Sequence, residues 1–221
     1  MEYLFNSILI IHIICSTIGL LSGTMSMALK KGNNFHRKIG QVYYFTMLIG
    51  GLSSMVLSAI HRNVFLFLLG IFTVYLVITG KRYLSYKNAD HKCNKFDWLH
   101  SIAMFLVAGI LVILGLYMII DRNEFGFIFI FFGLLGLRFT STDYTYFRGK
   151  SKVINFWLTV HFQRFTGSYI AALTAFLVVN AKYIHKTIPF WVVWLLPSII
   201  LIPVILRWTR KYRRIKQTLA D

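Results

Sequence analysis

The chain has 221 residues, of which 57% are hydrophobic and only 14% are charged, and its mean hydropathy is +0.65. Soluble globular domains carry about a quarter of charged residues, so this composition excludes an ordinary soluble domain and indicates a multi-pass membrane protein. The net charge of +17 lies mostly in short blocks between apolar runs, and no RNA- or DNA-binding motif accompanies it. We therefore expect no nucleic-acid partner. The basic blocks instead predict an attraction to anionic lipid headgroups.

Seven apolar segments follow one another along the chain, and most reach the roughly 20 residues that a membrane-spanning helix needs. The fifth segment, FGFIFIFFGLLGL, is short, and we expect it either to cross with little tilt or to continue into the interfacial stretch RFTSTDYTYF. The sequence thus predicts an all-α membrane protein, a seven-helix bundle that forms a single transmembrane domain over residues 1–221. The predicted spans are about 5–29, 40–60, 64–84, 98–120, 124–139, 156–180 and 189–207.

The connections between the spans alternate in basic charge. Segments 30–38, 81–97, 138–152 and 207–216 contain four, five, four and six Lys and Arg residues. The alternate segments 61–63, 121–124 and 181–188 contain one, one and two. Because cytoplasmic loops carry the excess of Lys and Arg, we expect the N-terminus outside and the C-terminus in the cytoplasm.

Small residues in two spans predict tight helix crossings. Gly19 and Gly23 are four residues apart in the first span, and Gly167 and Ala171 repeat that spacing in the sixth. His12 lies on the same face as Gly19 and Gly23, within about 20° at helical spacing. His12 is therefore either a hydrogen-bonded packing residue or part of a ligand site.

Mostly small and polar residues form a stripe along one face of the second span. His36 and His61, at its two ends, are 25 residues apart in sequence, about 37 Å at helical rise. Each is expected to cap or anchor a helix end, or to belong to a different site. The stripe comprises His36, Gly40, Tyr43, Met47, Gly50, Ser54 and His61.

The strongest candidate site combines residues of the fourth and sixth spans. Asp97 and His100 are three residues apart, where the carboxylate can accept the imidazole N–H. His161 lies about 7 Å and Arg164 about 12 Å from the cytoplasmic end of the sixth span, with Gln163 between them. An arginine at this depth snorkels, pairs with an anion or lines a polar cavity. His36 lies at the edge of the same leaflet.

The segments HIICSTIGLLSGTMSMALKKGNNFHRKIGQVYY and VHFQRFTGSYIAALTAFLVVN carry a resemblance to a known family. There the chain resembles small multi-pass bacterial integral-membrane proteins that are catalogued only as a domain of unknown function. The resemblance implies a multi-pass protein of the bacterial cytoplasmic membrane. It implies no activity, cofactor or catalytic residue.

A membrane redox protein that binds b-type haem is the first functional hypothesis, because haem needs neutral imidazoles in an apolar bundle. His100 and His161 would ligate the iron, Asp97 would orient His100, and Arg164 would pair with a propionate. His12 and His61 would serve a second site. The alternative to a bound ligand is a direct Asp97–Arg164 ion pair that ties the two helices together.

Three other functions stay open. A proton-coupled or anion transporter would bind its anion at Arg164 and relay protons through His161 or His100. A non-catalytic subunit would assemble with another membrane protein or with copies of itself. A metal-dependent hydrolase built from His36, His100, His161 and Asp97 is the weakest hypothesis, because no HExxH or comparable ligand spacing occurs.

Overall fold

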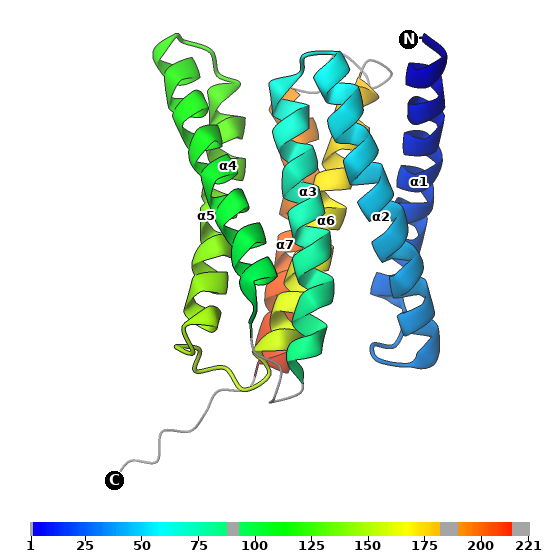
Figure 1. The fold of residues 1–221 in the computed structure, drawn as a ribbon, viewed down its shortest axis with the longest axis vertical. Coiled ribbons are helices and arrows are strands. Elements are labelled where there is room, and N and C mark those ends of the chain that lie inside the picture. Colours follow the sequence, from blue (N-terminus) through cyan, green and yellow to red (C-terminus); the bar gives the residue numbers. More distant parts are fainter. Residues whose placement is uncertain (1, 88–92, 182–189, 214–221) are drawn as a thin grey trace. The chain divides into compact units, whose positions relative to one another are not determined.

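In the computed structural model, which describes residues 2–87, 93–181 and 190–213, the chain forms long α-helices and one short 3-10 helix (Figure 1). These described residues contain no β-strand. The elements are α1 (Glu2–Ala28), α2 (Asn34–Ile60), α3 (Val64–Arg82), η1 (Tyr83–Lys87), α4 (Lys95–Ile120), α5 (Gly126–Phe147), α6 (Phe156–Val179) and α7 (Phe190–Tyr212).

Seven of these helices are long and apolar enough to cross a membrane, which confirms the predicted all-α class and agrees with seven candidate spans among the described residues. Several helices extend beyond their predicted bounds; α4 begins at Lys95 and α7 ends at Tyr212. The second begins at Asn34, and not near position 40, because the Asn33 side chain caps it by accepting the His36 N–H at 2.7 Å. The fifth continues to Phe147, which agrees with the expected continuation into RFTSTDYTYF. Position 189, the predicted start of the seventh span, lies outside the described residues.

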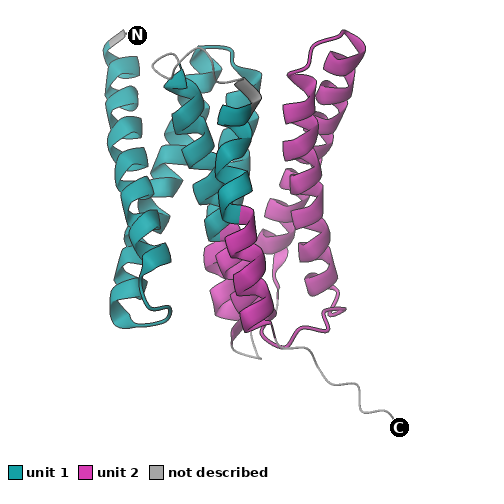
Figure 2. Cartoon of the chain, turned by 180° about the vertical axis from the view of Figure 1, so that it is seen from behind, with its two compact units in different colours: residues 1–78, 165–201 teal, residues 79–164, 202–221 magenta. Residues whose placement is uncertain are grey.

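The chain divides into two compact units, which are described separately below (Figure 2). Unit 1 consists of residues 1–78 and 165–201, and unit 2 consists of residues 79–164 and 202–221. The helices α3, α6 and α7 each contribute residues to both units.

In unit 1, α1 and α2 lie side by side and pack through small residues (Figure 1). A Cβ atom added to Gly19 would lie 2.7 Å from Met47 Sδ, and one added to Gly23 would lie 2.6 Å from the Tyr169 ring. Tight crossings at Gly19 and Gly23 are therefore confirmed. The core of this unit comprises Tyr43, Met47, Val77 and Tyr169.

In unit 2, α4 and α5 form a hairpin whose backbones approach closely (Figure 1). A Cβ atom added to Gly115 would lie 2.7 Å from Gly126 O, and one added to Gly133 would lie 2.9 Å from Ala108 O. Any side chain at these glycines would meet main-chain atoms, so the glycines set the distance between the two helices. A buried hydrophobic cluster lies in the same unit and comprises Tyr83, Tyr86 and Val160.

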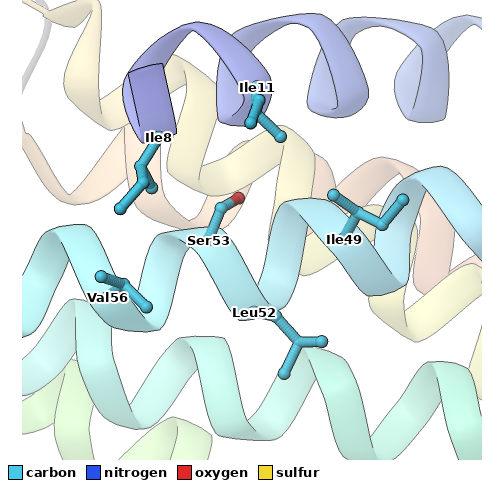
Figure 3. A pocket seen from close by; sticks show the side chains of 6 residues that line it. All are labelled: Ile8, Ile11, Ile49, Leu52, Ser53 and Val56. Atoms are coloured by element: carbon cyan, nitrogen blue, oxygen red, sulfur yellow. The ribbon is translucent and has the colours of Figure 1, made fainter. Parts of the chain in front are cut away.

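Large apolar side chains are exposed along helices of both units, for example Leu21 at 67%, Ile113 at 67% and Ile199 at 60%. Between α1 and α2, a shallow groove is also almost entirely apolar (Figure 3); Ile8, Ile11, Ile49, Leu52, Ser53 and Val56 line it. Soluble monomers rarely expose so much contiguous apolar surface, whereas helices in a bilayer do so as a rule.

Candidate functional site

The most buried charges of the described residues belong to unit 2, where Asp143 of α5 and Arg164 of α6 form an ion pair, here called the inner pair. Arg164 Nη2 donates to Asp143 Oδ1 at 2.7 Å and also to Phe139 O at 2.8 Å. The guanidinium carbon lies 4.4 Å from the centroid of the Phe139 ring. Asp143 is 0% exposed and Arg164 is 1% exposed, so bulk water does not screen the pair.

Two hydroxyl groups complete the surroundings of the Asp143 carboxylate. The Tyr83 hydroxyl of η1 donates to Oδ1 at 2.7 Å, and the Ser101 hydroxyl of α4 donates to Oδ2 at 3.2 Å. One carboxylate thus accepts hydrogen bonds from three other elements of the chain, η1, α4 and α6. Charge-assisted hydrogen bonds of this kind are stronger than neutral ones.

At the polar end of α5, hydroxyl side chains bond to carbonyls of the preceding turn. Thr142 Oγ1 donates to Arg138 O, and Thr145 Oγ1 donates to Ser141 O, both at 2.9 Å. These bonds satisfy the hydroxyls within the helix itself. The helix continues four residues beyond Asp143, to Phe147, so the carboxylate lies on a regular helical face.

A second ion pair, here called the outer pair, joins Arg82 at the end of α3 to Asp97 at the start of α4. Arg82 Nε contacts Asp97 Oδ1, and Arg82 Nη2 donates to Asp97 Oδ2 at 2.9 Å. Asp97 Oδ2 also accepts the Asn94 N–H at 2.9 Å, which completes a capping box at the start of α4. The Arg82 side chain is 27% exposed, so this pair is more accessible than the inner pair.

The polar residues in the first half of α6 have partners on three other helices. His161 Nδ1 donates to Gly80 O of α3 at 2.9 Å, since a carbonyl oxygen can only accept. Gln163 Nε2 donates to Thr209 Oγ1 of α7 at 3.0 Å, and Arg164 pairs with Asp143 of α5. The stretch HFQR therefore connects α6 to its neighbours within unit 2.

Two predicted contacts of Asp97 are wrong. Its carboxylate does not orient His100, because it binds the cation Arg82 and the capping N–H of Asn94, and His100 Nδ1 bonds to Phe96 O at 2.8 Å. A direct Asp97–Arg164 pair does not form either, because each of the two residues has another ionic partner. Ligation of a haem iron by His100 and His161 stays a prediction.

The two histidines of the predicted second site lie in unit 1. His12 Nδ1 donates to Gly50 O at 3.0 Å and lies 3.1 Å from Ser53 Oγ. The His61 ring, at the C-terminal cap of α2, packs edge-on against Phe5 with 5.1 Å between ring centroids. His12 is therefore a half-buried residue that links α1 to α2, and His61 ends a helix as the sequence predicts. A ligand role for either stays a prediction.

His36 anchors the start of α2, as expected, by contacting the end of α1. Its Nδ1 lies 3.3 Å from Ser26 Oγ. Lys31, in the turn between the two helices, donates from Nζ to Ser26 O at 2.8 Å and satisfies a carbonyl at the end of α1. Burial of this ammonium group lowers the pKa of Lys31. The residues of this turn serve helix termination.

Among the described residues, no group of three or more His, Cys, Asp or Glu side chains is arranged to hold a metal ion. The hydrolase hypothesis therefore has no support from the described part of the chain. Comparison with known protein families, with curated proteins and with solved structures finds no match to this chain.

Arg164 and Asp97 stand out in the sequence as candidate site residues, whereas four further members of the two pairs and their surroundings do not: Asp143, Tyr83, Ser101 and Arg82. The small number of acidic residues, seven in the chain, was one signal for Asp143. Glu2, Asp121 and Glu124 lie at the predicted outer ends of helices, and Asp90 and Asp221 lie outside the described residues. Asp97 and Asp143 are the two acids that remain near the predicted cytoplasmic ends of helices.

Proposed function

We propose that this chain is a multi-pass protein of the bacterial cytoplasmic membrane that carries a small anion together with a proton through the inner pair. Seven apolar helices with exposed Leu, Ile and Phe side chains support the placement in a bilayer. The alternation of basic connections supports an outside N-terminus and a cytoplasmic C-terminus, and it puts the ends of α3, α5 and α7 on the cytoplasmic side.

The observation that carries the proposal is the buried Asp143 carboxylate with its arginine partner. Ionisable residues inside a membrane bundle are costly and commonly mark proton or ion pathways. Apolar residues of similar volume often stabilise a protein as well as a buried ion pair does, so stability alone does not explain Asp143 and Arg164. A function in which one partner changes its charge does explain them.

The chemistry of the pair couples a proton to an anion. In the resting state Arg164 is neutralised by Asp143 at 2.7 Å. When a proton binds to Asp143, the negative charge of the carboxylate is lost, and Arg164 then attracts an anion from the aqueous solution. Loss of the proton restores the internal pair and displaces the anion. Proton and anion therefore bind together and leave together, which is the linkage that a symporter requires.

A flux assay in proteoliposomes tests this function. Vesicles that contain purified protein and a trapped pH-sensitive dye would receive inward gradients of chloride, phosphate or acetate, with the membrane potential clamped. We expect acidification that depends on one of these anions and that disappears in Asp143→Asn. Asp121→Asn is the matched control, because Asp121 is exposed at the far end of α4. Equal flux in empty vesicles, or an active Asp143→Asn variant, would contradict the proposal.

An absorption spectrum separates the carrier from the haem protein. Arg164 already has a carboxylate of the protein as its partner, so its depth no longer argues for a propionate. If the protein is a carrier without haem, we expect no Soret band after expression with haem supplied. A Soret band that is lost in both His100→Ala and His161→Ala would identify a haem protein and contradict the carrier.

A further inference from the structure

The outer and inner pairs of unit 2 are connected by neighbouring residues of the same elements. Arg82 of the outer pair precedes Tyr83, which donates to Asp143. On α4, Asp97 lies one turn before Ser101, which also donates to Asp143. Residues four apart on a helix have Cβ atoms about 5–6 Å apart, so Asp97 and Ser101 lie on the same face of α4. Ser101 bonds to Asp143, and Asp97 bonds to Arg82 and to the Asn94 N–H.

The two pairs differ in their access to water. The Arg82 side chain is 27% exposed and Asp97 is 5% exposed, whereas Asp143 and Arg164 are 0% and 1% exposed. Lys95, in the first turn of α4, is also exposed. The outer pair therefore lies between solvent at this end of unit 2 and the inner pair, and a proton that enters here meets Asp97 before Asp143.

We infer that Asp97 is the outer proton acceptor that supplies Asp143, with Ser101 as the link between the two carboxylates. The inference rests on the proposed function in one respect, namely that Asp143 exchanges a proton. It adds the route and its direction, from the end of the unit that carries Arg82 and Asp97 to the buried carboxylate.

The transfer balances as a relay of one proton. A hydronium ion protonates the Asp97 carboxylate, which then gives up its contact with Arg82. Once released from Arg82, the Asp97 carboxylic acid turns toward Ser101, its neighbour one turn along α4, and donates this proton to Ser101 Oγ. The Ser101 hydroxyl proton then passes to Asp143 Oδ2, its acceptor at 3.2 Å. Asp97 returns to the carboxylate form and pairs with Arg82 again. The net change is one proton moved from water to Asp143, and no electrons are exchanged.

Other charged and titratable groups face this route. Tyr86 of η1 lies beside Arg82 and Asp97, and its ring packs 5.3 Å from that of Tyr83. Tyr146 of α5 packs 5.5 Å from Tyr83, also between ring centroids. His161 lies one turn before Arg164 and bonds to Gly80 O. The tyrosines stay neutral during the relay, since phenols ionise near pH 10 in water.

Infrared spectroscopy after a rapid pH drop tests the route directly. The carboxylic-acid band of Asp143 would be identified as the band that is absent in Asp143→Asn. We expect its rise to be slowed by about 100-fold in Asp97→Asn, the lower end of what a positioned acid or base contributes. The final amplitude should not change, because Asp143 itself is intact. Asp97→Glu should restore the rate, and Asp121→Asn, on the same helix, should leave it unchanged.

A second variant covers the outcome in which Asp97→Asn does not fold because the α4 cap is weakened. Ser101→Ala leaves the cap and the outer pair in place, and it should slow the rise of the Asp143 band to a similar extent. Ser141→Ala, at an exposed position of α5, is its control. A wild-type rate in Asp97→Asn or in Ser101→Ala would overturn the route.

Failure of the route and failure of the carrier are distinguishable. An Asp143 band that forms normally, together with the absence of anion-dependent proton flux, would contradict the carrier alone. Anion-dependent flux in the wild type with a wild-type band rate in Asp97→Asn would contradict the route alone. No Asp143 band at any pH at which the protein stays folded would contradict both.

Discussion

The two units satisfy their buried polar groups in different ways. Unit 1 uses neutral hydroxyls: Tyr43 OH lies 2.7 Å from Ser168 Oγ, and Thr24 Oγ1 lies 2.7 Å from Tyr169 OH. Unit 2 uses full charges, with the inner pair at its most buried point. A hydroxyl that loses its partner can rotate to another acceptor. A buried charged group that loses its counter-ion stays charged and unpaired. The charged cluster is therefore expected to be far more sensitive to single substitutions.

Removing the arginine of the inner pair should have the largest effect. In Arg164→Met the Asp143 carboxylate stays buried without its cation, and the expected loss of stability is about 3–5 kcal/mol. Thermal unfolding of the purified protein in detergent would measure it. The double variant Arg164→Met/Asp143→Leu should recover most of the loss, and Arg138→Met, at an exposed arginine, should change little. A single Arg164→Met variant as stable as the wild type would show that the pair is dispensable for folding.

Substitution of packed glycines should also destabilise unit 2 more than unit 1, although by less than the loss of Arg164. Gly133→Ala puts a methyl group 2.9 Å from Ala108 O, which is main chain, so we expect a loss of about 1–3 kcal/mol. Gly19→Ala meets Met47 Sδ at 2.7 Å, but that atom is part of a flexible side chain. Its loss should be below about 1 kcal/mol. The ratio of the two melting shifts is the measurement, and a larger shift for Gly19→Ala would reverse the comparison.

The smallest effect is expected from the neutral cluster. Tyr43→Phe removes one hydroxyl, but Ser168 Oγ keeps its hydrogen bond to Phe165 O at 2.8 Å. The expected loss is about 0.5–1.5 kcal/mol, the net contribution of an ordinary hydrogen bond. Tyr3→Phe, at an exposed position of α1 in the same unit, is a control for the change of side chain. A loss as large as that of Arg164→Met would contradict the distinction between the clusters.

The sequence predicts the helices well because apolar runs and basic connections are local signals. For the fifth span it leaves two ends open, because the apolar run stops near 139, and the structure continues α5 through RFTSTDYTYF to Phe147. Asp143 lies in that extension, so the prediction left the partner of Arg164 in an interfacial stretch. Arg164 itself was prominent because it is the one Lys or Arg outside the connecting segments.

Pairing between helices is the part that one sequence does not contain. Asp97 and Arg164 are at comparable depths, and depth alone favours their contact as much as that of Asp143 with Arg164. The choice depends on which faces the helices present to one another. In unit 2 the faces are such that Arg164 meets Asp143 and Asp97 meets Arg82. Such register follows from packing between residues that are far apart in sequence.

The glycine-lined face of α5 also bears on how the protein would be made. Of the two helices of this hairpin, α5 is the less hydrophobic, whereas α4 is the most hydrophobic of the seven candidate spans. An insertion machinery that reads one segment at a time would release α4 into lipid readily and retain α5. Because α5 can bury its glycines only against α4, we expect the two segments to leave that machinery together, as a helical hairpin, so that biogenesis of the fifth span depends on the fourth.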